Sequence, residues 1–235
     1  MCSNYRPVTR EDRLLTFFGV ERAEGEELPS EVYPLGLAPF IRLQNEGSGN
    51  KVIQDGQFGL LPSFAKELAY GRKTYNARSE TVHELPSFRD AWRDGRRCVI
   101  PAECIFEPCY ATGRSVRWCI QQPGQVPLGI AGVYKLHPWL KDKKGQPVWS
   151  FAMLTVNADG HPVFQRMHKP GEEKRMVVVL DPAEYDRWLQ CPVSEAPSFF
   201  RQWTGVLDAF PEPAAPRAKK PSPLDDVPPG SGSLF

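Results

Sequence analysis

Short apolar stretches, several of them alternating with polar residues, dominate the chain and predict strands. Proline and glycine turns, rather than helices of about 10 to 15 residues, separate most of these stretches, which argues against repeated βαβ units. We therefore expect an α+β domain with a mainly antiparallel, barrel-like β core and a few short flanking helices. The expected strands are residues 35–43, 56–60, 97–100, 116–120, 128–134, 149–156 and 175–180.

Helices are few and begin at capping sequences. In the strongest case Asp181 can cap the helix, a proline follows at the first helical position, and Glu184 completes a capping box. A second helix is expected over residues 10–19, with Thr9 as its N-cap. Shorter helices are expected over residues 62–69 and after Ser87.

The C-terminal part of the chain differs from the rest in composition. Residues 211–235 contain seven of the 24 prolines and almost no large apolar residues to bury. We find no internal repeat, so one domain is expected over residues 1–208, followed by a disordered, proline-rich tail over residues 209–235.

Composition and charge narrow the class of protein. The chain of 235 residues is 41% hydrophobic and 24% charged, as expected for a folded soluble domain. Its net charge of +1 provides no global field for a polyanion, so nucleic-acid binding has to be local. Residues 66–97 carry eight basic and five acidic side chains, which makes a local DNA track plausible, although solvated helix faces explain the same counts. No apolar run approaches the roughly 18 residues of a membrane span.

The six cysteines are expected to be buried free thiols. The N-terminus lacks the features of a secretory signal, so we expect a reducing, cytoplasmic location, with nucleoid association if the source is bacterial. The spacing of the internal cysteines contains no C-x2-C pair of the kind that holds zinc. Neither a metal nor an organic cofactor is predicted.

Cys2 is the most informative single residue. Removal of Met1 would place a thiol and a free α-amine on one residue. The amine can attack an aldehyde to form an imine, and the thiol can then close a five-membered thiazolidine on the same carbon. The same groups could instead perform acyl transfer, with the thiolate as nucleophile and the amine as base.

Several sequence segments together resemble one family. They are Met1-Cys2, Phe58–Phe64, Tyr75-Asn76-Ala77-Arg78-Ser79-Glu80-Thr81, Arg97–Ala102 with Phe106-Glu107, and His168 ahead of Arg175–Leu180. In this combination and order they resemble the SOS-response-associated peptidase (SRAP) family of abasic-site processing proteins. The resemblance covers residues 2 to about 190 and excludes the tail.

The resemblance implies an enzyme that binds single-stranded DNA and forms a covalent crosslink between Cys2 and the ring-opened aldehyde of an abasic site. By the same analogy Asn76 positions Cys2 and the opened sugar, Glu107 handles protons, and His168 helps to open the deoxyribose ring. The family name reflects a proposed self-cleavage that exposes Cys2, so lyase or autopeptidase activity is a further expectation. Neither a membrane nor an obligatory protein partner is implied.

The family analogy also implies DNA contacts, and this chain departs from the family pattern in three places. The implied contacts are Arg78, Ser79, Arg175, Phe64 and Pro39. The departures are Phe58, where tryptophan is usual, Pro108, where an aromatic residue is common, and about five inserted residues between His168 and Arg175. The insertion leaves His161, seven residues before His168, as an alternative for the catalytic histidine.

Two other functions are consistent with the residues alone. One is a thiol hydrolase of the N-terminal-nucleophile type, which would be blocked by thiol alkylation and would not need DNA. The other is a non-enzymatic reader of modified DNA, whose affinity would survive a Cys2→Ala substitution.

Overall fold

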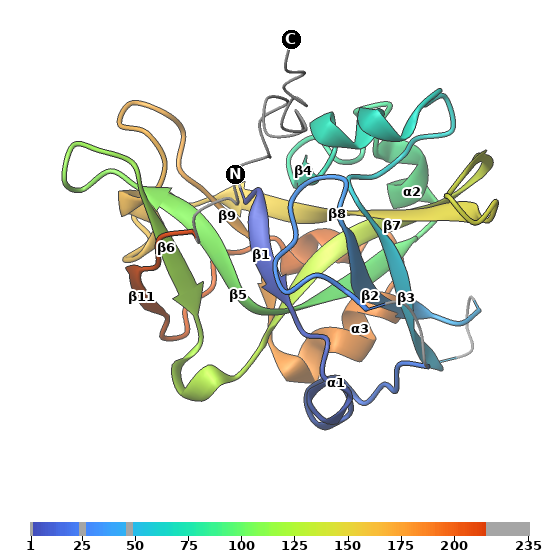
Figure 1. The fold of residues 1–235 in the computed structure, drawn as a ribbon, viewed down its shortest axis with the longest axis horizontal. Helices are drawn as coiled ribbons and strands as arrows, with labels where there is room; N and C mark the ends of the chain where they lie inside the picture. Colours follow the sequence, from blue (N-terminus) through green and yellow to red (C-terminus); the bar gives the residue numbers. More distant parts are fainter. Residues whose placement is uncertain (1, 24–26, 46–48, 215–235) are drawn as a thin grey trace, which may run out of the picture.

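The computed structural model describes residues 2–23, 27–45 and 49–214 and is built around a closed five-stranded barrel (Figure 1). The barrel strands are β2 (Leu37–Leu43), β3 (Lys51–Phe58), β5 (Arg97–Cys109), β7 (Leu128–Lys141) and β8 (Pro147–Asn157). They pair in the order β7-β8-β3-β2-β5, and β5 returns to β7 to close the barrel. Only the β3–β8 pair is parallel among these five, which confirms the expected mainly antiparallel, barrel-like α+β fold.

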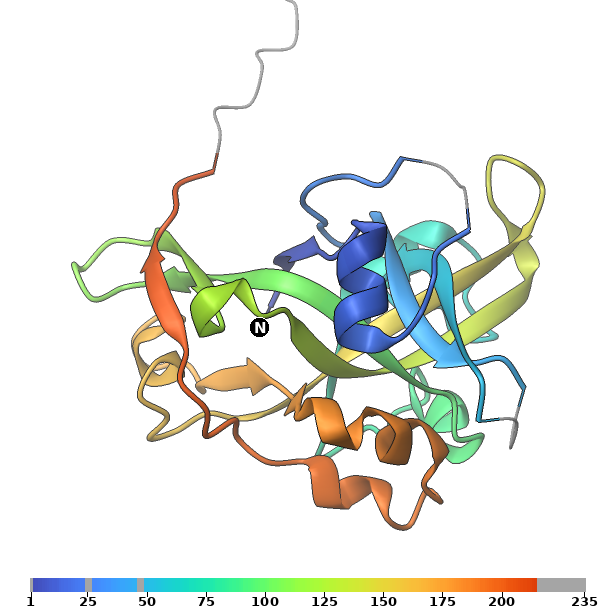
Figure 2. The ribbon, with the colours of Figure 1, turned by 90° about the horizontal axis from the view of Figure 1, so that it is seen from below.

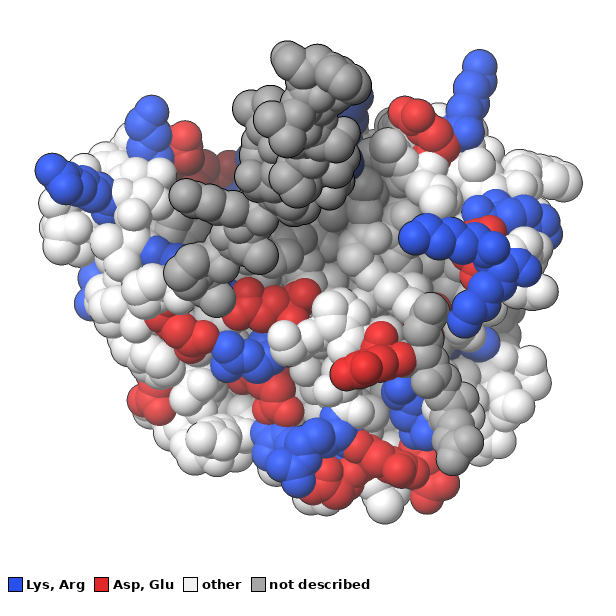
Figure 3. Space-filling model, in the orientation of Figure 1, with Lys and Arg blue, Asp and Glu red and all other residues white. Residues whose placement is uncertain are grey.

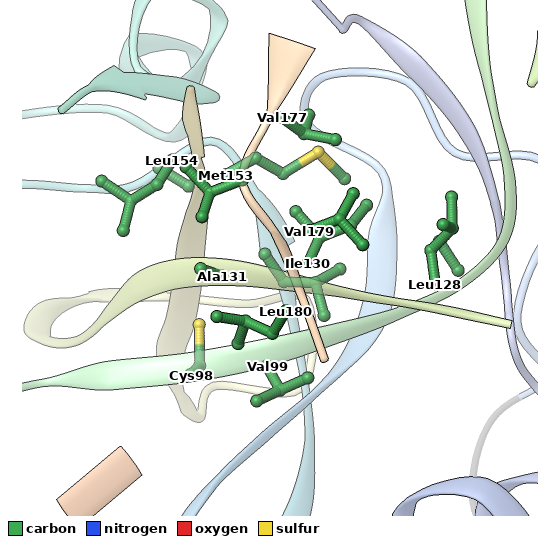
Figure 4. Close-up of a cluster of buried hydrophobic side chains, with 14 of the residues drawn as sticks. Cys98, Val99, Leu128, Ile130, Ala131, Met153, Leu154, Val177, Val179 and Leu180 are labelled. Atoms are coloured by element: carbon green, nitrogen blue, oxygen red, sulfur yellow. The ribbon is translucent and has the colours of Figure 1, made fainter. Parts of the chain in front are cut away.

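Buried side chains pack along the strands of the barrel wall (Figure 4). Ile130 and Ala131 of β7 and Met153 and Leu154 of β8 are all fully buried, and because neighbours along a strand point to opposite faces, both faces of the wall are covered. Burial of each large aliphatic side chain contributes about 1.5–3 kcal/mol, so this cluster stabilises the barrel. Gly132 lets β7 approach its neighbours, because a Cβ there would lie 2.7 Å from the carbonyl oxygen of Ala152.

Further strands extend the sheet beyond the barrel. β5 is 13 residues long, far longer than the expected strand 97–100, and its second half pairs with β1 (Asn4–Pro7) and β6 (Val116–Gln121). β4 (Asn76–Arg78) and β9 (Arg175–Val177) pair with β8, and β10 (Val179–Leu180) pairs with β7. The expected single strand 175–180 is therefore two strands, because the chain passes from β8 to β7 at Val178.

Helices cover the lower side of the barrel in Figure 1, and Figure 2 shows that side directly. The capping box at Asp181 is confirmed and leads through η4 (Pro182–Glu184) into α3 (Tyr185–Gln190). The predicted helix 10–19 is α1 (Glu11–Phe18), but Arg10 rather than Thr9 is its N-cap. The remaining helical segments are α2 (Arg89–Arg93), η1 (Leu68–Lys73), η2 (Pro123–Gln125), η3 (Phe164–Arg166) and η5 (Ala196–Phe199).

One local prediction, the helix over residues 62–69, was wrong. Residues 62–67 form no helix, and η1 begins only at Leu68, because Leu61 and Ala65 pack against Val148 of β8. The domain boundary at 208 falls inside β11 (Asp208–Pro211), which pairs with β6 and is seen at the left of Figure 2. Glu212 then accepts a hydrogen bond from Arg6 of β1 at 2.7 Å. The tail prediction for residues 215–235 lies outside the described residues.

All six cysteines are free and buried, as predicted. Among the described residues, no helix combines the length and the apolar character needed to cross a bilayer.

Candidate active site

The N-terminal strand brings Cys2 to the far half of β5. In the antiparallel pairing of β1 with β5, Asn4 lies opposite Phe106 and Tyr5 opposite Ile105, so the chain before Asn4 runs past Glu107. The Nδ2 atom of Asn76 in β4 donates a hydrogen bond to the carbonyl oxygen of Cys2 at 2.8 Å. The Cys2 residue is 1% exposed. Thus Asn76, 74 positions away in the chain, holds the main chain of Cys2 in place.

The environment of Cys2 keeps its thiol protonated. Burial raises the pKa of the thiol well above its ordinary value, and the negative charge of Glu107 raises it further. The Sγ atom lies 3.5 Å from the carbonyl oxygen of Asn4, to which it donates a weak hydrogen bond. The thiol of this buried residue therefore needs a proton acceptor before it can act as a nucleophile.

Glu107 and His168 form a buried pair beside Cys2. The Oε2 atom of Glu107 lies 2.9 Å from Nε2 of His168, and the two side chains are 1% and 7% exposed. Glu107 projects from β5, whereas His168 lies in the loop that follows η3. Carboxylate and imidazole at hydrogen-bond distance can exchange a proton, so the site contains an acid–base pair next to a nucleophile.

The backbone around His168 is tightly constrained. His168 has a positive φ of 61°, a left-handed conformation that is uncommon outside glycine. Its N–H donates to the carbonyl oxygen of Pro108 at 2.8 Å, and Lys174 donates through Nζ to the His168 carbonyl at 3.2 Å. Pro108, a departure from the family pattern, thus uses its carbonyl group to place the histidine. The stretch between His168 and Arg175 is part of this support, because Lys174 lies in it.

His161 has a different environment. Its Nδ1 accepts hydrogen bonds from the N–H groups of Val163 and Phe164, at 3.1 and 3.2 Å, and its Nε2 lies 2.9 Å from the carbonyl oxygen of Trp203. Burial lowers the pKa of this imidazole. The structure therefore places His168, and not His161, against Glu107.

Arg78 and Arg175 share a carboxylate. Glu173 accepts from Arg78 at 2.8 Å and from Arg175 at 2.5 Å. The side chain of Arg175 is 2% exposed and also binds Glu80, whereas that of Arg78 is 46% exposed. Arg175 is thus buried and bound by two carboxylates, and its predicted contact with DNA stays a prediction. Arg78 has an exposed guanidinium that a phosphate can reach.

The other predicted DNA contacts separate into exposed and buried residues. Phe64 is 52% exposed and packs edge-on against Tyr70, so its ring is accessible. Ser79 is 8% exposed, and its N–H donates to the carbonyl oxygen of Thr155. Pro39 is buried in β2 opposite Asp55, and its predicted contact with DNA stays a prediction. The predicted strand that contains Pro39 is part of the barrel wall, which accounts for its burial.

Phe58 and Tyr75 line the inner side of the site. Phe58 is fully buried and packs edge-on against both Tyr5 and Tyr75, with ring centroids 5.3 and 5.7 Å apart. Phe58 therefore has a packing role and is not available to stack on a base. Burial raises the pKa of the Tyr75 phenol, and the nearby Cys2 and Glu107 side chains raise it further.

Sequence reasoning did not assign a role to Tyr75 or Glu173. Tyr75 directly precedes Asn76 in the recognised segment, and Glu173 lies in the insertion, so their positions in the sequence were the only signals. No group of three or more His, Cys, Asp or Glu side chains that could hold a metal occurs within the described ranges. The site can provide a nucleophile, an acid–base pair and a cationic residue at its edge.

Comparisons with known proteins give consistent matches. The family model described as SOS response associated peptidase (SRAP) matches residues 1–211. The chain is 34% identical over 215 residues to the abasic site processing protein YobE of Bacillus subtilis, covering 89% of this chain and 90% of that one. It is 27% identical to the abasic site processing protein HMCES of Gallus gallus, covering 74% of this chain and 56% of that one.

Solved structures share the fold. A protein of Bordetella bronchiseptica superposes with a TM-score of 0.81 at 32% identity, covering 91% of this chain and all of that one. A protein of Bacteroides thetaiotaomicron superposes with a TM-score of 0.73 at 20% identity, covering 89% of this chain and 91% of that one.

Proposed function

This chain belongs to the SOS response associated peptidase family, and from that membership we propose that it processes abasic sites in DNA through Cys2. The relatives YobE and HMCES are named abasic site processing proteins, which supports this class of substrate. The observation that carries the proposal is the position of Cys2. Its main chain is held by Asn76, and its thiol lies beside a carboxylate that is paired with an imidazole.

The proposed reaction joins Cys2 to the sugar of the abasic site. Removal of Met1, which lies outside the described residues, frees the α-amine of Cys2. Opening of the deoxyribose ring exposes an aldehyde, and His168 is the group that transfers the proton in this step. The amine attacks the aldehyde carbon, and loss of water gives an imine.

Ring closure completes the crosslink. The thiol adds across the carbon–nitrogen double bond, so a carbon–sulfur bond forms and the thiol proton passes, through Glu107, to the nitrogen. The product is a thiazolidine, and no oxidant or reductant is consumed. Because the thiol of Cys2 is held protonated, attack by the amine comes first. The Glu107–His168 pair then acts as one acid–base unit, with His168 transferring the proton in ring opening and Glu107 in ring closure.

The substrate strand is proposed to be single-stranded DNA. Arg78 lies at the edge of the site with an accessible guanidinium, which can bind a phosphate oxygen. Phe64 offers an exposed ring on which an unpaired base can stack. An abasic nucleotide in a single strand also needs no unpairing energy before its sugar reaches a buried thiol.

The direct test is to incubate the protein with a single-stranded oligonucleotide that contains one abasic site. We expect a denaturation-resistant adduct whose mass equals protein without Met1 plus oligonucleotide minus one water. Cys2→Ala should form no stable adduct, whereas Cys191→Ser, which alters a buried thiol at the end of α3, should react like wild type. Absence of an adduct from wild-type protein that has lost Met1 would overturn the proposal.

A further inference from the structure

Trp139 is the most exposed large hydrophobic side chain in the described part of the molecule. It is 75% exposed and lies near the end of β7, close to the turn that joins β7 to β8. Exposure of the apolar indole surface to water is unfavourable, and the described residues cover only a small part of it. Nothing in the reaction proposed above uses this residue.

The end of β7 lies against the segment that carries Phe64. Nζ of Lys135 donates to Oγ of Ser63 at 2.7 Å. Leu140 and Tyr70 both pack on the small cluster formed by Leu61, Ala65 and Val148, and Tyr70 contacts the ring of Phe64. Both ribbon views place the β7–β8 hairpin beside the chain around residue 65 (Figures 1 and 2).

These two segments are strongly basic. Residues 64–73 and 135–147 together hold seven Lys and Arg against two acidic residues, a net charge of +5 in a chain whose total is +1. Figure 3 shows several Lys and Arg side chains, with some Asp and Glu among them, on the right of the molecule, where Figure 1 shows the β7–β8 hairpin. We call the exposed surface formed by these two segments the hairpin surface. Its basic residues are Lys66, Arg72, Lys73, Lys135, Lys141, Lys143 and Lys144.

The combination of aromatic and basic side chains points to one kind of occupant. Lysine is depleted in the cores of protein–protein interfaces, so a second protein is a poor match for this surface. Single-stranded DNA needs both a cationic track for its backbone and aromatic faces for its bases. The segment 64–73 also leads directly into β4, so the hairpin surface is continuous along the chain with Asn76 and Arg78.

We propose that the hairpin surface binds single-stranded DNA on one side of the reacting nucleotide, with bases stacked on Trp139 and Phe64 and phosphates bound by the lysines of the β7–β8 turn. This inference rests on the proposed function, since it extends the strand that would place the abasic site at Cys2. It assigns a binding role to Trp139, Lys143 and Lys144.

Fluorescence anisotropy with unmodified single-stranded oligonucleotides of increasing length tests this assignment. Trp139→Ala should weaken binding of a long oligonucleotide by at least about fivefold, because stacking contributes about 1–3 kcal/mol per base. The double variant Lys143→Ala, Lys144→Ala should lower the slope of log affinity against log salt by about 1.4, or about 0.7 per lost phosphate contact. Oligonucleotides too short to reach the hairpin should bind all variants equally.

Matched controls are Tyr33→Ala for the aromatic residue and Arg10→Ala for the charges, because both side chains are exposed outside these two segments. Equal affinities of Trp139→Ala and Tyr33→Ala for the long oligonucleotide would overturn the proposal. So would a concentration-dependent dimer that Trp139→Ala dissociates, since the surface would then join two copies.

The result of the DNA-binding assay can be separated from the result of the crosslinking reaction at Cys2. The binding assay uses DNA without an abasic site, so it reports on the hairpin surface even if no adduct forms. Conversely, crosslinking of an abasic oligonucleotide too short to reach the hairpin reports on Cys2 alone.

Discussion

Nε2 of His168 lies 2.9 Å from Oε2 of Glu107, although the two residues are separated by 60 others in the chain. The contact depends on three supports. β5 extends beyond the barrel and carries Glu107, the N–H of His168 binds the Pro108 carbonyl, and Lys174 holds the loop from the other side. An acid–base pair is therefore built by joining the rim of a β-barrel to a constrained loop.

Neutral substitutions in this pair should slow the crosslink. We expect Glu107→Gln and His168→Gln each to reduce the rate of adduct formation by about 10²–10⁴-fold, the usual contribution of general acid–base catalysis. Because the two groups act as a unit, the double variant should be no slower than the slower single variant. Time courses on denaturing gels measure these rates, and simple multiplication of the two effects would contradict a shared role.

Asn76→Ala should loosen the N-terminus. The substitution removes the hydrogen bond from Nδ2 to the Cys2 carbonyl, which contributes about 1 kcal/mol to stability. The rate of adduct formation should fall, because the amine and thiol are no longer held in one orientation. Thermal unfolding measures the loss of stability, and single-turnover kinetics measure the rate of adduct formation. A loss of stability with an unchanged rate would show that Asn76 has a structural role alone.

Glu173→Gln should strengthen DNA binding. Partial burial alone would raise the pKa of Glu173, but hydrogen bonds and charges from Arg175 and Arg78 hold it below the ordinary value, so the group is ionised at neutral pH. Its carboxylate accepts a hydrogen bond from Arg78 at 2.8 Å and therefore competes with a DNA phosphate for that guanidinium. Affinity for single-stranded DNA should rise severalfold in Glu173→Gln. Glu172→Gln, the exposed neighbour, is the control, and equal effects of the two variants would indicate a general charge effect.

Alkaline pH should destabilise the protein through its buried thiols. Burial raises the pKa of Cys2, Cys98 and Cys191 above the ordinary value of 9.0. The folded state then keeps protons that the unfolded chain releases, so stability is fully present below pH 9 and is lost as pH rises above it. Thermal unfolding between pH 7 and about pH 10.5 measures the loss. Cys98→Ala should lose less stability over this interval than wild type does.

Acidic pH should lower the stability of the folded protein through His161. Burial lowers the pKa of this imidazole below 6.5, so the unfolded chain binds a proton that the folded state excludes, and stability falls as pH drops below 6.5. A protonated Nδ1 would face the N–H groups of Val163 and Phe164. His161→Asn should flatten the dependence of Tm on pH, whereas the exposed His83→Asn should not. Neither variant should change the rate of adduct formation.

If His161→Asn formed the adduct more slowly than wild type at a temperature where the variant is folded, the assignment of the catalytic role to His168 would be contradicted.

Local patterns in the sequence were enough to predict part of this fold. The alternation at Val116–Ile120 and the capping sequence at Asp181 depend on neighbouring residues, and both elements occur where they were expected. β1 and β4 were not predicted, because four- and three-residue strands carry too little periodicity and exist only through their partners β5 and β8. The helix expected at residues 62–69 did not form as predicted, because tertiary packing of this segment against Val148 outweighs the helical preference of the local sequence.

For the site, the sequence by itself determined which chemical groups are present, namely a cysteine directly after Met1 and an ordered set of polar segments. Tertiary structure alone decided which of them meet. It placed His168 and not His161 on Glu107, buried Arg175 and Pro39, and left Arg78 and Trp139 exposed. The physical reason is that proximity between residues far apart in the chain is set by strand register and loop constraint, which no local pattern encodes.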